Sequence, residues 1–229
     1  HPEKLQEAVV KHKANLGLAY DGDADRLIAV DENGNIVDGD HIMVLSAIHL
    51  KNKGKLAQDT LVVTVMSNIG LTIAAKEHGI NLATTAVGDR YVLEEMKNSG
   101  YNLGGEQSGH MIFLDYNTTG DGVLSSLVLA QIVLEEGKNL SELAAVMTQY
   151  PQVLVNARIK NENKNRYMEY PEIKSEIERI EKLLDGCGRV LIRPSGTEPL
   201  VRVMLEGKEE GQIKELATNL ANLIQEKLS

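Results

Sequence analysis

Aromatic residues are scarce in this sequence, and its charge balance is acidic. The 229 residues include no Trp, one Phe and seven Tyr, and the formal net charge is −9. Nucleic-acid binding requires basic counter-charge for the phosphate backbone and rings that stack on bases. We therefore expect no nucleic-acid partner for this chain.

Cysteine and long apolar runs are also scarce. The single cysteine, Cys187, has no second thiol with which to form an internal disulfide, and this usage is typical of a reducing compartment. No apolar stretch approaches the ~20 residues of a membrane-spanning helix, and no signal peptide opens the chain. We expect a cytoplasmic protein with no membrane partner.

The first residues suggest a piece cut from a longer protein. The chain begins His1-Pro2-Glu3 without Met and passes directly into a helical pattern. Residues 1–38 predict one helix, strands at 16–20 and 27–30, and a turn at 33–34. Because so short a segment cannot bury enough surface to fold independently, we expect it to be the end of a domain that begins earlier.

The rest of the chain divides at the Tyr150-Pro151 junction. From residue 39 to 150, helical and strand patterns alternate, which indicates an α/β layer with a parallel sheet. Residues 151–229 predict a compact α+β module. The predicted helices lie at 41–51, 69–78, 91–98, 124–135, 140–147, 171–184 and 209–228, and the predicted strands at 60–66, 81–85, 101–104, 152–159, 189–192 and 200–206.

Three carboxylates gather in the turn Asp21-Gly22-Asp23-Ala24-Asp25-Arg26. Acidic side chains at alternate positions of such a turn can converge on one hard cation, which offsets their mutual repulsion. Asp21, Asp23 and Asp25 are therefore predicted to bind a divalent metal, Mg²⁺, and Arg26 to meet an anionic ligand that shares it.

Two alternatives remain for this turn. One is a plain acidic surface turn, and the other is an EF-hand loop with Glu32 at its twelfth position. The EF-hand is disfavoured because its sixth position, which requires Gly for a sharp turn, is Arg26.

A second polar segment is Gly104-Gly105-Glu106-Gln107-Ser108-Gly109-His110. Its glycines allow the backbone to approach a ligand, and Glu106, Ser108 and His110 point the same way if the segment is extended. A carboxylate, a hydroxyl and an imidazole suit sugar hydroxyls and a nearby phosphate. The alternative is a solvated turn with a surface histidine.

The third segment is Arg193-Pro194-Ser195-Gly196-Thr197-Glu198-Pro199, between two predicted strands. Arg offers two donors to a phosphate, Ser and Thr add hydroxyls, and Gly196 frees backbone N–H groups to point at the same anion. Arg202, on the following strand, adds a further charge. The segment therefore predicts a phosphate cradle, with a proline-bordered hairpin as the alternative.

Three weaker signals accompany these segments. Asp89, in Val87-Gly88-Asp89-Arg90, is predicted to cap the helix that follows. Ser67-Asn68 stands at the carboxyl end of a predicted parallel strand, where α/β folds place ligands, or else caps the next helix. Cys187 is interpreted as a packing residue, because no His or other base accompanies it in the sequence.

With the three loops in this order, the chain resembles the α-D-phosphohexomutases. Residues 21–26 resemble the metal loop of that family, residues 105–110 its sugar loop and residues 193–197 its phosphate loop. Ala24 stands where the family more commonly has Gly. Gln107 and the segments around residues 67 and 89 are similar to the branch that acts on glucosamine phosphates.

The resemblance implies a mixed-sheet α/β domain at 39–150, the third of the family's four. It implies that 1–38 is the tail of the second domain with the metal loop, and that 151–229 is the fourth, a C-terminal α+β phosphate-binding domain. The first domain, which carries the phosphoserine, has no counterpart in the sequence. The chain alone is therefore expected to be inactive and to need the missing N-terminal domains as partners.

The implied activity is the interconversion of glucosamine 6-phosphate and glucosamine 1-phosphate. It runs through a phosphoserine and a 1,6-bisphosphate with Mg²⁺, and it supplies amino sugar for UDP-N-acetylglucosamine and the cell wall. Arg26 and His110 are implied as catalytic residues. The implied substrate-binding residues are Gly88, Asp89, Arg90, Glu106, Ser108, Arg193, Ser195, Gly196, Thr197 and Arg202.

Other functions stay open at this point. One is a phosphomannomutase or phosphoglucomutase of the same family. Another is a non-catalytic module that binds a sugar phosphate or a metal, and a third is a metal-dependent phosphatase with water as the acceptor. Assembly as a homodimer is a further open alternative.

Overall fold

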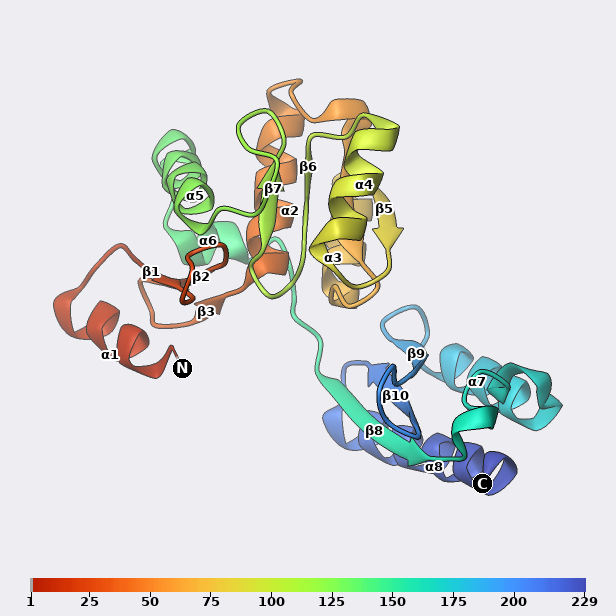
Figure 1. Ribbon diagram of the computed structural model, residues 1–229. Coiled ribbons are helices and arrows are strands. Elements are labelled where there is room, and N and C mark those ends of the chain that lie inside the picture. Colours follow the sequence, from red (N-terminus) through yellow and green to blue (C-terminus); the bar gives the residue numbers. More distant parts are fainter. Residues whose placement is uncertain (1) are drawn as a thin grey trace. The chain divides into compact units, whose positions relative to one another are not determined.

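The computed structural model describes residues 2–229, and the chain divides into two units, one ending at Thr148 and one beginning at Gln149 (Figure 1). The first unit contains residues 2–38 together with the α/β region that follows. Each unit is described by itself below.

A small antiparallel sheet opens the first unit. Helix α1 (Glu3–His12) precedes strands β1 (Leu16–Tyr20), β2 (Leu27–Asp31) and β3 (Ile36–Val37), which pair in the order β1-β2-β3. The first helix and two strands confirm the prediction, whereas the two-residue β3 is too short to produce an alternating pattern in the sequence. The acidic turn is the connection between β1 and β2.

A four-stranded mixed sheet forms the centre of this unit, in the order β5-β4-β6-β7. Strands β4 (Thr60–Thr64), β5 (Asn81–Thr85) and β6 (Leu103–Gly105) are parallel. Strand β7 (Met111–Phe113) runs antiparallel to β6. The mixed-sheet class is confirmed, but the fully parallel sheet expected from the alternation is wrong, because the segment after β6 turns back as a hairpin.

Helices cover both faces of this sheet. Leu61 and Val63 of β4 pack into the core formed with α2 (Gly39–Asn52), α3 (Ile69–Glu77) and α5 (Gly122–Glu136). Val62, between them, packs on the other face against Val92 and Met96 of α4 (Asp89–Ser99). This is the alternation of side chains expected along a strand buried on both sides. The unit is completed by α6 (Leu140–Ala144) and the short helix η1 (Ala57–Asp59).

The second unit is an antiparallel sheet with helices on one face. Strands β8 (Gln152–Arg158), β10 (Leu200–Glu206) and β9 (Arg189–Pro194) pair in that order. Val201, Val203 and Leu205 of β10 pack into one core with helices α7 (Pro171–Leu183) and α8 (Glu210–Leu228). Two short helices, η2 (Asn161–Asn163) and η3 (Tyr167–Glu169), lie between β8 and α7.

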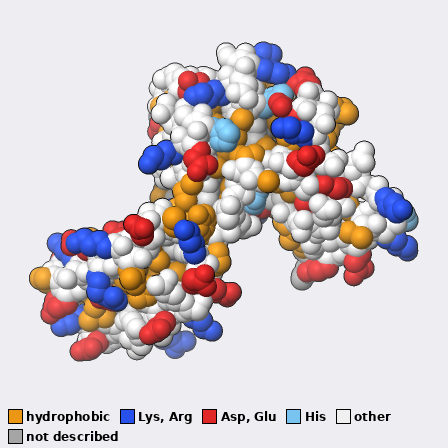
Figure 2. Space-filling model, turned by 180° about the vertical axis from the view of Figure 1, so that it is seen from behind, with side chains coloured by type: hydrophobic (Ala, Val, Ile, Leu, Met, Phe, Trp, Pro, Cys, Tyr) orange, Lys and Arg blue, Asp and Glu red, His pale blue; other side chains and the backbone are white. Residues whose placement is uncertain are grey.

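The surface carries charges of both signs. Figure 2 shows Lys and Arg side chains interspersed with Asp and Glu over the face in view. Among the helices of residues 2–229, none combines the length and the apolar character needed to cross a membrane.

Candidate functional site

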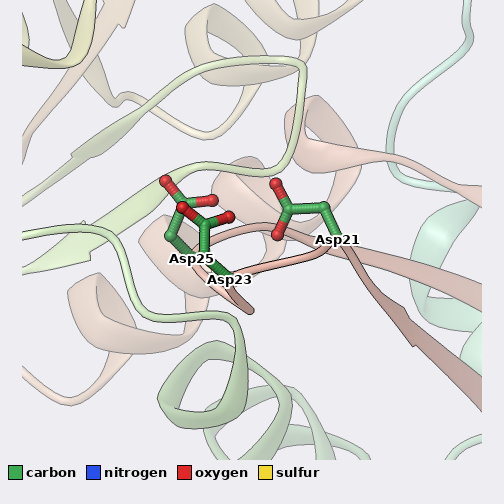
Figure 3. Close-up of side chains that lie close together, drawn as sticks. All are labelled: Asp21, Asp23 and Asp25. Carbon is green, nitrogen blue, oxygen red and sulfur yellow. The ribbon is translucent and has the colours of Figure 1, made fainter.

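The turn between β1 and β2 brings three carboxylates together. Asp21, Asp23 and Asp25 each offer an oxygen, and these oxygens all lie within 4.8 Å of one another (Figure 3). Backbone geometry shapes the turn: Ala24 has φ 58° and donates its N–H to the carbonyl of Asp21 at 3.2 Å. A left-handed conformation costs a residue with a Cβ about 1–2 kcal/mol, so this position favours Gly.

Arg26 stands beside these carboxylates without a close ion pair. Its Nε lies 3.7 Å from Oδ2 of Asp21 and 3.9 Å from Oδ1 of Asp25, and its side chain is 51% exposed. Its backbone N–H donates to Oδ1 of Asp21 at 3.2 Å. Because such loose, exposed pairs contribute little, the guanidinium is available to an anionic ligand. The EF-hand alternative is wrong, since β2 occupies residues 27–31 and the Glu32 carboxylate accepts from the backbone N–H of Ser141 at 3.2 Å.

The second polar segment is a tight hairpin turn between β6 and β7. The N–H of Gly109, at φ 94°, donates to the carbonyl of Glu106 at 3.0 Å, and the N–H of Glu106 donates to the carbonyl of His110 at 2.9 Å. The segment is therefore not extended, and the expectation that Glu106, Ser108 and His110 point the same way does not hold for His110.

Glu106 and Ser108 line a hollow of about 520 Å³ together with Arg26 and Gln107. A second hollow of about 350 Å³ also includes Arg26 and Ser108, and adds Asp21. The two hollows therefore share two residues beside the acidic turn. One carboxylate oxygen of Glu106 accepts from the backbone N–H of Gly88 at 3.0 Å, which ties the 87–90 segment to the hairpin.

His110 is buried and lies against the acidic turn. Its Nδ1 is 2.9 Å from Oδ2 of Asp25, and its Nε2 accepts from the backbone N–H of Gly120 at 3.1 Å. A Cβ at Gly120 would lie 2.4 Å from the imidazole ring, so glycine is required there. The N–H of Gly122, at the start of α5, donates to the carbonyl of Ala24 at 2.9 Å. These contacts join residues far apart in the sequence, so no local pattern predicts them.

The beginning of α2 supports the hairpin from the other side. Gly39 donates its N–H to the carbonyl of Gln107 at 3.2 Å, and a Cβ at Gly39 would lie 2.4 Å from the carbonyl of Glu106. Asp38 caps the helix and accepts from the side chains of His41 at 2.7 Å and Gln107 at 3.3 Å. Burial alone raises the pKa of Asp38, but the hydrogen bond and charge of His41 outweigh it and hold that pKa below its usual value.

Asp89 and Arg90 are less closely tied to these hollows. Gly88 is the residue that precedes α4 and Asp89 is its first residue, with no side-chain cap, so the predicted Asp89 cap is wrong. The Arg90 side chain is 80% exposed and pairs with Glu94 at 2.8 Å. Asn68 does cap α3 through its side chain, by accepting from the N–H of Gly70 at 2.9 Å.

Asp40 is a buried acid that the sequence analysis did not single out. It has no exposed surface, and its Oδ2 accepts from the backbone N–H of Asn68 at 2.7 Å, which joins the first turns of α2 and α3. Burial is the largest effect on its pKa, the Asn68 hydrogen bond opposes it, and the charge of Asp38 adds to it. Together they raise the pKa of Asp40 to about 7.

In the second unit, the predicted phosphate loop is shorter than expected. Strand β9 continues to Pro194 rather than ending at Ile192, so Arg193 lies on the strand, directly opposite Arg202 of β10. Like charges opposite one another destabilise a sheet. Partial burial, and then the charge of Arg202, lower the pKa of Arg193. The arginine pair therefore favours an anion at this place.

The turn that follows holds the remaining predicted residues. Ser195 is buried, and its hydroxyl accepts from the N–H of Glu198 at 3.1 Å, whereas Gly196 and Thr197 are exposed. Lys164 donates to the carbonyl of Ser195 at 2.8 Å. This lysine adds a positive charge beside the turn that the sequence did not indicate, because it is 31 residues away along the chain.

Comparison with protein families assigns the class to which this fold and these loops belong. Residues 38–150 match the model described as phosphoglucomutase/phosphomannomutase, alpha/beta/alpha domain III, and residues 154–223 match the C-terminal domain of the same family. The chain belongs to the phosphoglucomutase/phosphomannomutase family of phosphohexomutases.

Its curated relatives carry a more particular name. The phosphoglucosamine mutase of Clostridioides difficile (strain 630) is 84% identical over 229 residues, which are 100% of this chain and 51% of that protein. The phosphoglucosamine mutase of Caldanaerobacter subterraneus subsp. tengcongensis is 66% identical over the same 229 residues and the same 51% share. The chain spans about half the length of the curated relatives that it matches.

Solved structures show the same fold at lower identity. A phosphoglucomutase/phosphomannomutase family protein from Burkholderia thailandensis has a TM-score of 0.76 at 23% identity, covering 100% of this chain and 52% of that one. An N-acetylphosphoglucosamine mutase from Aspergillus fumigatus, in complex with GlcNAc-6P and magnesium, has a TM-score of 0.74 at 22% identity, covering 93% of this chain and 49% of that one.

The buried Asp40 generates a prediction about pH and stability. Its pKa is about 7 in the folded chain and near 4 in an unfolded one, so the folded state binds the proton more tightly between these values. Asp40 therefore contributes to the free energy of unfolding at low pH, and this contribution is lost as the pH rises to about 7. Asp40→Asn, which keeps an acceptor for the Asn68 N–H, should remove this dependence.

The measurement is the free energy of unfolding of the first unit at pH 5 and pH 8. Between pH 5 and pH 8 the parent should lose roughly 3 kcal/mol more unfolding free energy than Asp40→Asn does. The control is Glu77→Gln, a change at an exposed acid of the same unit that should follow the parent. Equal pH slopes for Asp40→Asn and the parent would contradict the assignment.

Proposed function

We propose that this chain is the metal- and sugar-phosphate-binding part of a phosphoglucosamine mutase. The observation that carries the proposal is the group of three carboxylates within 4.8 Å, beside Arg26 and the hollow lined by Glu106 and Ser108. The identity of 84% to a relative of that name supports the choice of amino sugar. The substrates are glucosamine 6-phosphate and glucosamine 1-phosphate, handled in the cytoplasm.

The acidic turn fits a magnesium ion in its chemistry. Mg²⁺ prefers oxygen ligands, and proteins bind it through carboxylates together with water and substrate phosphate. Asp21, Asp23 and Asp25 would hold the ion, and the magnesium present in one related structure supports this assignment. When bound, the ion neutralises negative charge on the transferred phosphoryl group.

The residues of the first unit bind and orient the sugar end of the substrate. Arg26, with its exposed guanidinium, binds the phosphoryl group beside the acidic turn. Glu106 and Ser108 accept and donate hydrogen bonds to the sugar hydroxyls. Gly88 contributes through its backbone, because its N–H fixes one oxygen of Glu106. Asp89 and Arg90, exposed at the start of α4, contact the substrate from that segment.

The second unit binds the phosphate that is not transferred. Arg193 and Arg202 face each other across the strands, and the exposed Gly196 and Thr197 follow in the turn. The buried Ser195 holds that turn through its hydroxyl. Since this cradle recognises only a phosphate, it serves either orientation of a bisphosphate intermediate equally well.

The test of this function is interconversion of the two glucosamine phosphates. The chain alone should be inactive, since the family's phosphoserine is expected in the half of the relatives that it does not match. Joining that half to it in one polypeptide should give turnover. Activity in the purified chain would show that the group carrying the phosphoryl lies in this chain and not in the missing half. Inactivity of the complete protein would contradict the proposed function.

A second prediction concerns the phosphate cradle. Charge-assisted hydrogen bonds contribute about 1.5–3 kcal/mol each, so Arg193→Ala should weaken binding of glucosamine 6-phosphate by roughly ten- to a hundredfold. Thermal stability should stay the same or rise, because the repulsion with Arg202 is removed. Arg193→Lys should restore binding in part, as a point charge lacks the two-donor geometry.

The measurement is an NMR titration of the chain with inorganic phosphate and with glucosamine 6-phosphate. The matched control is Arg179→Ala, because Arg179 is an exposed arginine on α7 that pairs with Glu176 at 2.8 Å. Its affinity should equal that of the parent. If the amides of residues 195–197 shift with neither ligand, the turn is a structural hairpin and the cradle is refuted.

A further inference from the structure

We propose that Asp40 is a positioning residue for the sugar hollow, the hollow of about 520 Å³ that Glu106 and Ser108 line. Asp40 is fully buried and is not among the residues that line this hollow. It acts by joining two of the segments that do. This role rests on the proposed function, because it requires the sugar of the substrate to bind in the hollow.

The two segments lie far apart in the sequence. The β6–β7 hairpin contributes residues 106–108 to the hollow, and the end of β4 with the segment after it contributes Thr64 and Met66. The first turn of α2 contacts both of them, as the next two paragraphs show. The width of the hollow therefore depends on how firmly this one turn holds each segment.

The hairpin is seated directly on the first turn of α2. Gly39 donates its N–H to the carbonyl of Gln107 at 3.2 Å, and a Cβ at Gly39 would lie 2.4 Å from the carbonyl of Glu106. The Asp38 side chain accepts from the side chain of Gln107 at 3.3 Å. Both contacts come from the two residues that precede Asp40 in the sequence.

Asp40 connects the same turn to the segment after β4. Its Oδ2 accepts from the backbone N–H of Asn68 at 2.7 Å, a short distance typical of a charge-assisted hydrogen bond. Asn68 is the residue that caps α3, since its side chain accepts from the N–H of Gly70 at 2.9 Å. The bond from Asp40 therefore fixes the chain two residues after Met66, where α3 begins.

The burial of Asp40 favours a functional role over a purely stabilising one. Within residues 2–229, its Oδ1 has no hydrogen-bond partner and no exposed surface. A buried carboxylate with an unsatisfied oxygen costs free energy, more so than a neutral acceptor in the same place. Stability alone therefore does not explain an acid at this position, whereas a firm hold on the Asn68 N–H does.

Two substitutions of Asp40 test this role. Asp40→Ala removes the acceptor, and Asp40→Asn keeps one. In an NMR titration of the chain with glucosamine 6-phosphate, followed at the amides of residues 106–108, Asp40→Ala should bind roughly tenfold more weakly than the parent, as expected for one lost buried hydrogen bond. Asp40→Asn should retain most of the affinity.

Two other sites in the same chain serve as internal controls. Mg²⁺ binding, followed at residues 21–26, and inorganic phosphate binding, followed at residues 195–197, should be the same in the parent and in both Asp40 variants. A variant that was merely destabilised or misfolded would not keep these responses while losing only the one at the hairpin.

Asn68→Pro removes the donor and leaves the carboxylate intact. The φ of Asn68 is −59°, which proline adopts, and proline has no N–H to donate to Asp40. Asn68→Ala is the matched control, because it loses the same side chain and keeps the backbone N–H. Asn68→Pro should bind glucosamine 6-phosphate roughly tenfold more weakly than Asn68→Ala.

The parent chain gives a test that needs no variant. When glucosamine 6-phosphate binds, the amide of Asn68 should shift and exchange more slowly with solvent, because the bond to Asp40 is tightened together with the hollow. If Asp40→Ala and Asn68→Pro do not fold, this amide decides, and an amide that the ligand leaves unchanged overturns the inference.

The outcomes separate this inference from the proposed function. If the amides of residues 106–108 in the parent do not respond to glucosamine 6-phosphate, the sugar site of the proposed function is wrong. If they respond and Asp40→Ala binds as tightly as the parent, only the positioning role of Asp40 is refuted.

Discussion

Repulsion among three carboxylates is the constraint on which this part of the molecule depends. Oxygens of Asp21, Asp23 and Asp25 lie within 4.8 Å of one another, so the turn must hold them against their own charge. Hydrogen bonds from Gly122 to Ala24 and between His110 and Asp25 supply that support from two other segments of the chain. The left-handed Ala24 shows that the turn keeps this shape at a cost in backbone strain.

Glycine makes the convergence of these segments sterically feasible. At Gly39, Gly109 and Gly122, a Cβ would lie between 2.1 and 2.6 Å from a backbone oxygen of a neighbouring segment. The starts of α2 and α5, the β6–β7 hairpin and the acidic turn therefore pack backbone against backbone. This packing places Arg26, Glu106 and Ser108 around one hollow, although they come from two distant parts of the sequence.

Local sequence patterns predicted most of the helices and strands. The features that they did not predict depend on contacts between segments that lie far apart in the sequence. The acidic turn was predictable because its carboxylates lie close together in the sequence, and β1 because it is a short apolar run that ends at that turn. Strand β7 was missed, since its three apolar residues, Met111, Ile112 and Phe113, are too few to indicate a strand. The direction of His110 depends on Gly120 and Asp25, 10 and 85 residues away, which no periodicity encodes.

The most direct test is a crystal structure of the chain grown with Mn²⁺ in place of Mg²⁺, with the metal located by its anomalous scattering. We expect one peak within bonding distance of carboxylate oxygens of Asp21, Asp23 and Asp25, with Nδ1 of His110 still hydrogen-bonded to Oδ2 of Asp25. A metal bound directly by the His110 ring, or no peak at the turn under saturating Mn²⁺, would contradict it.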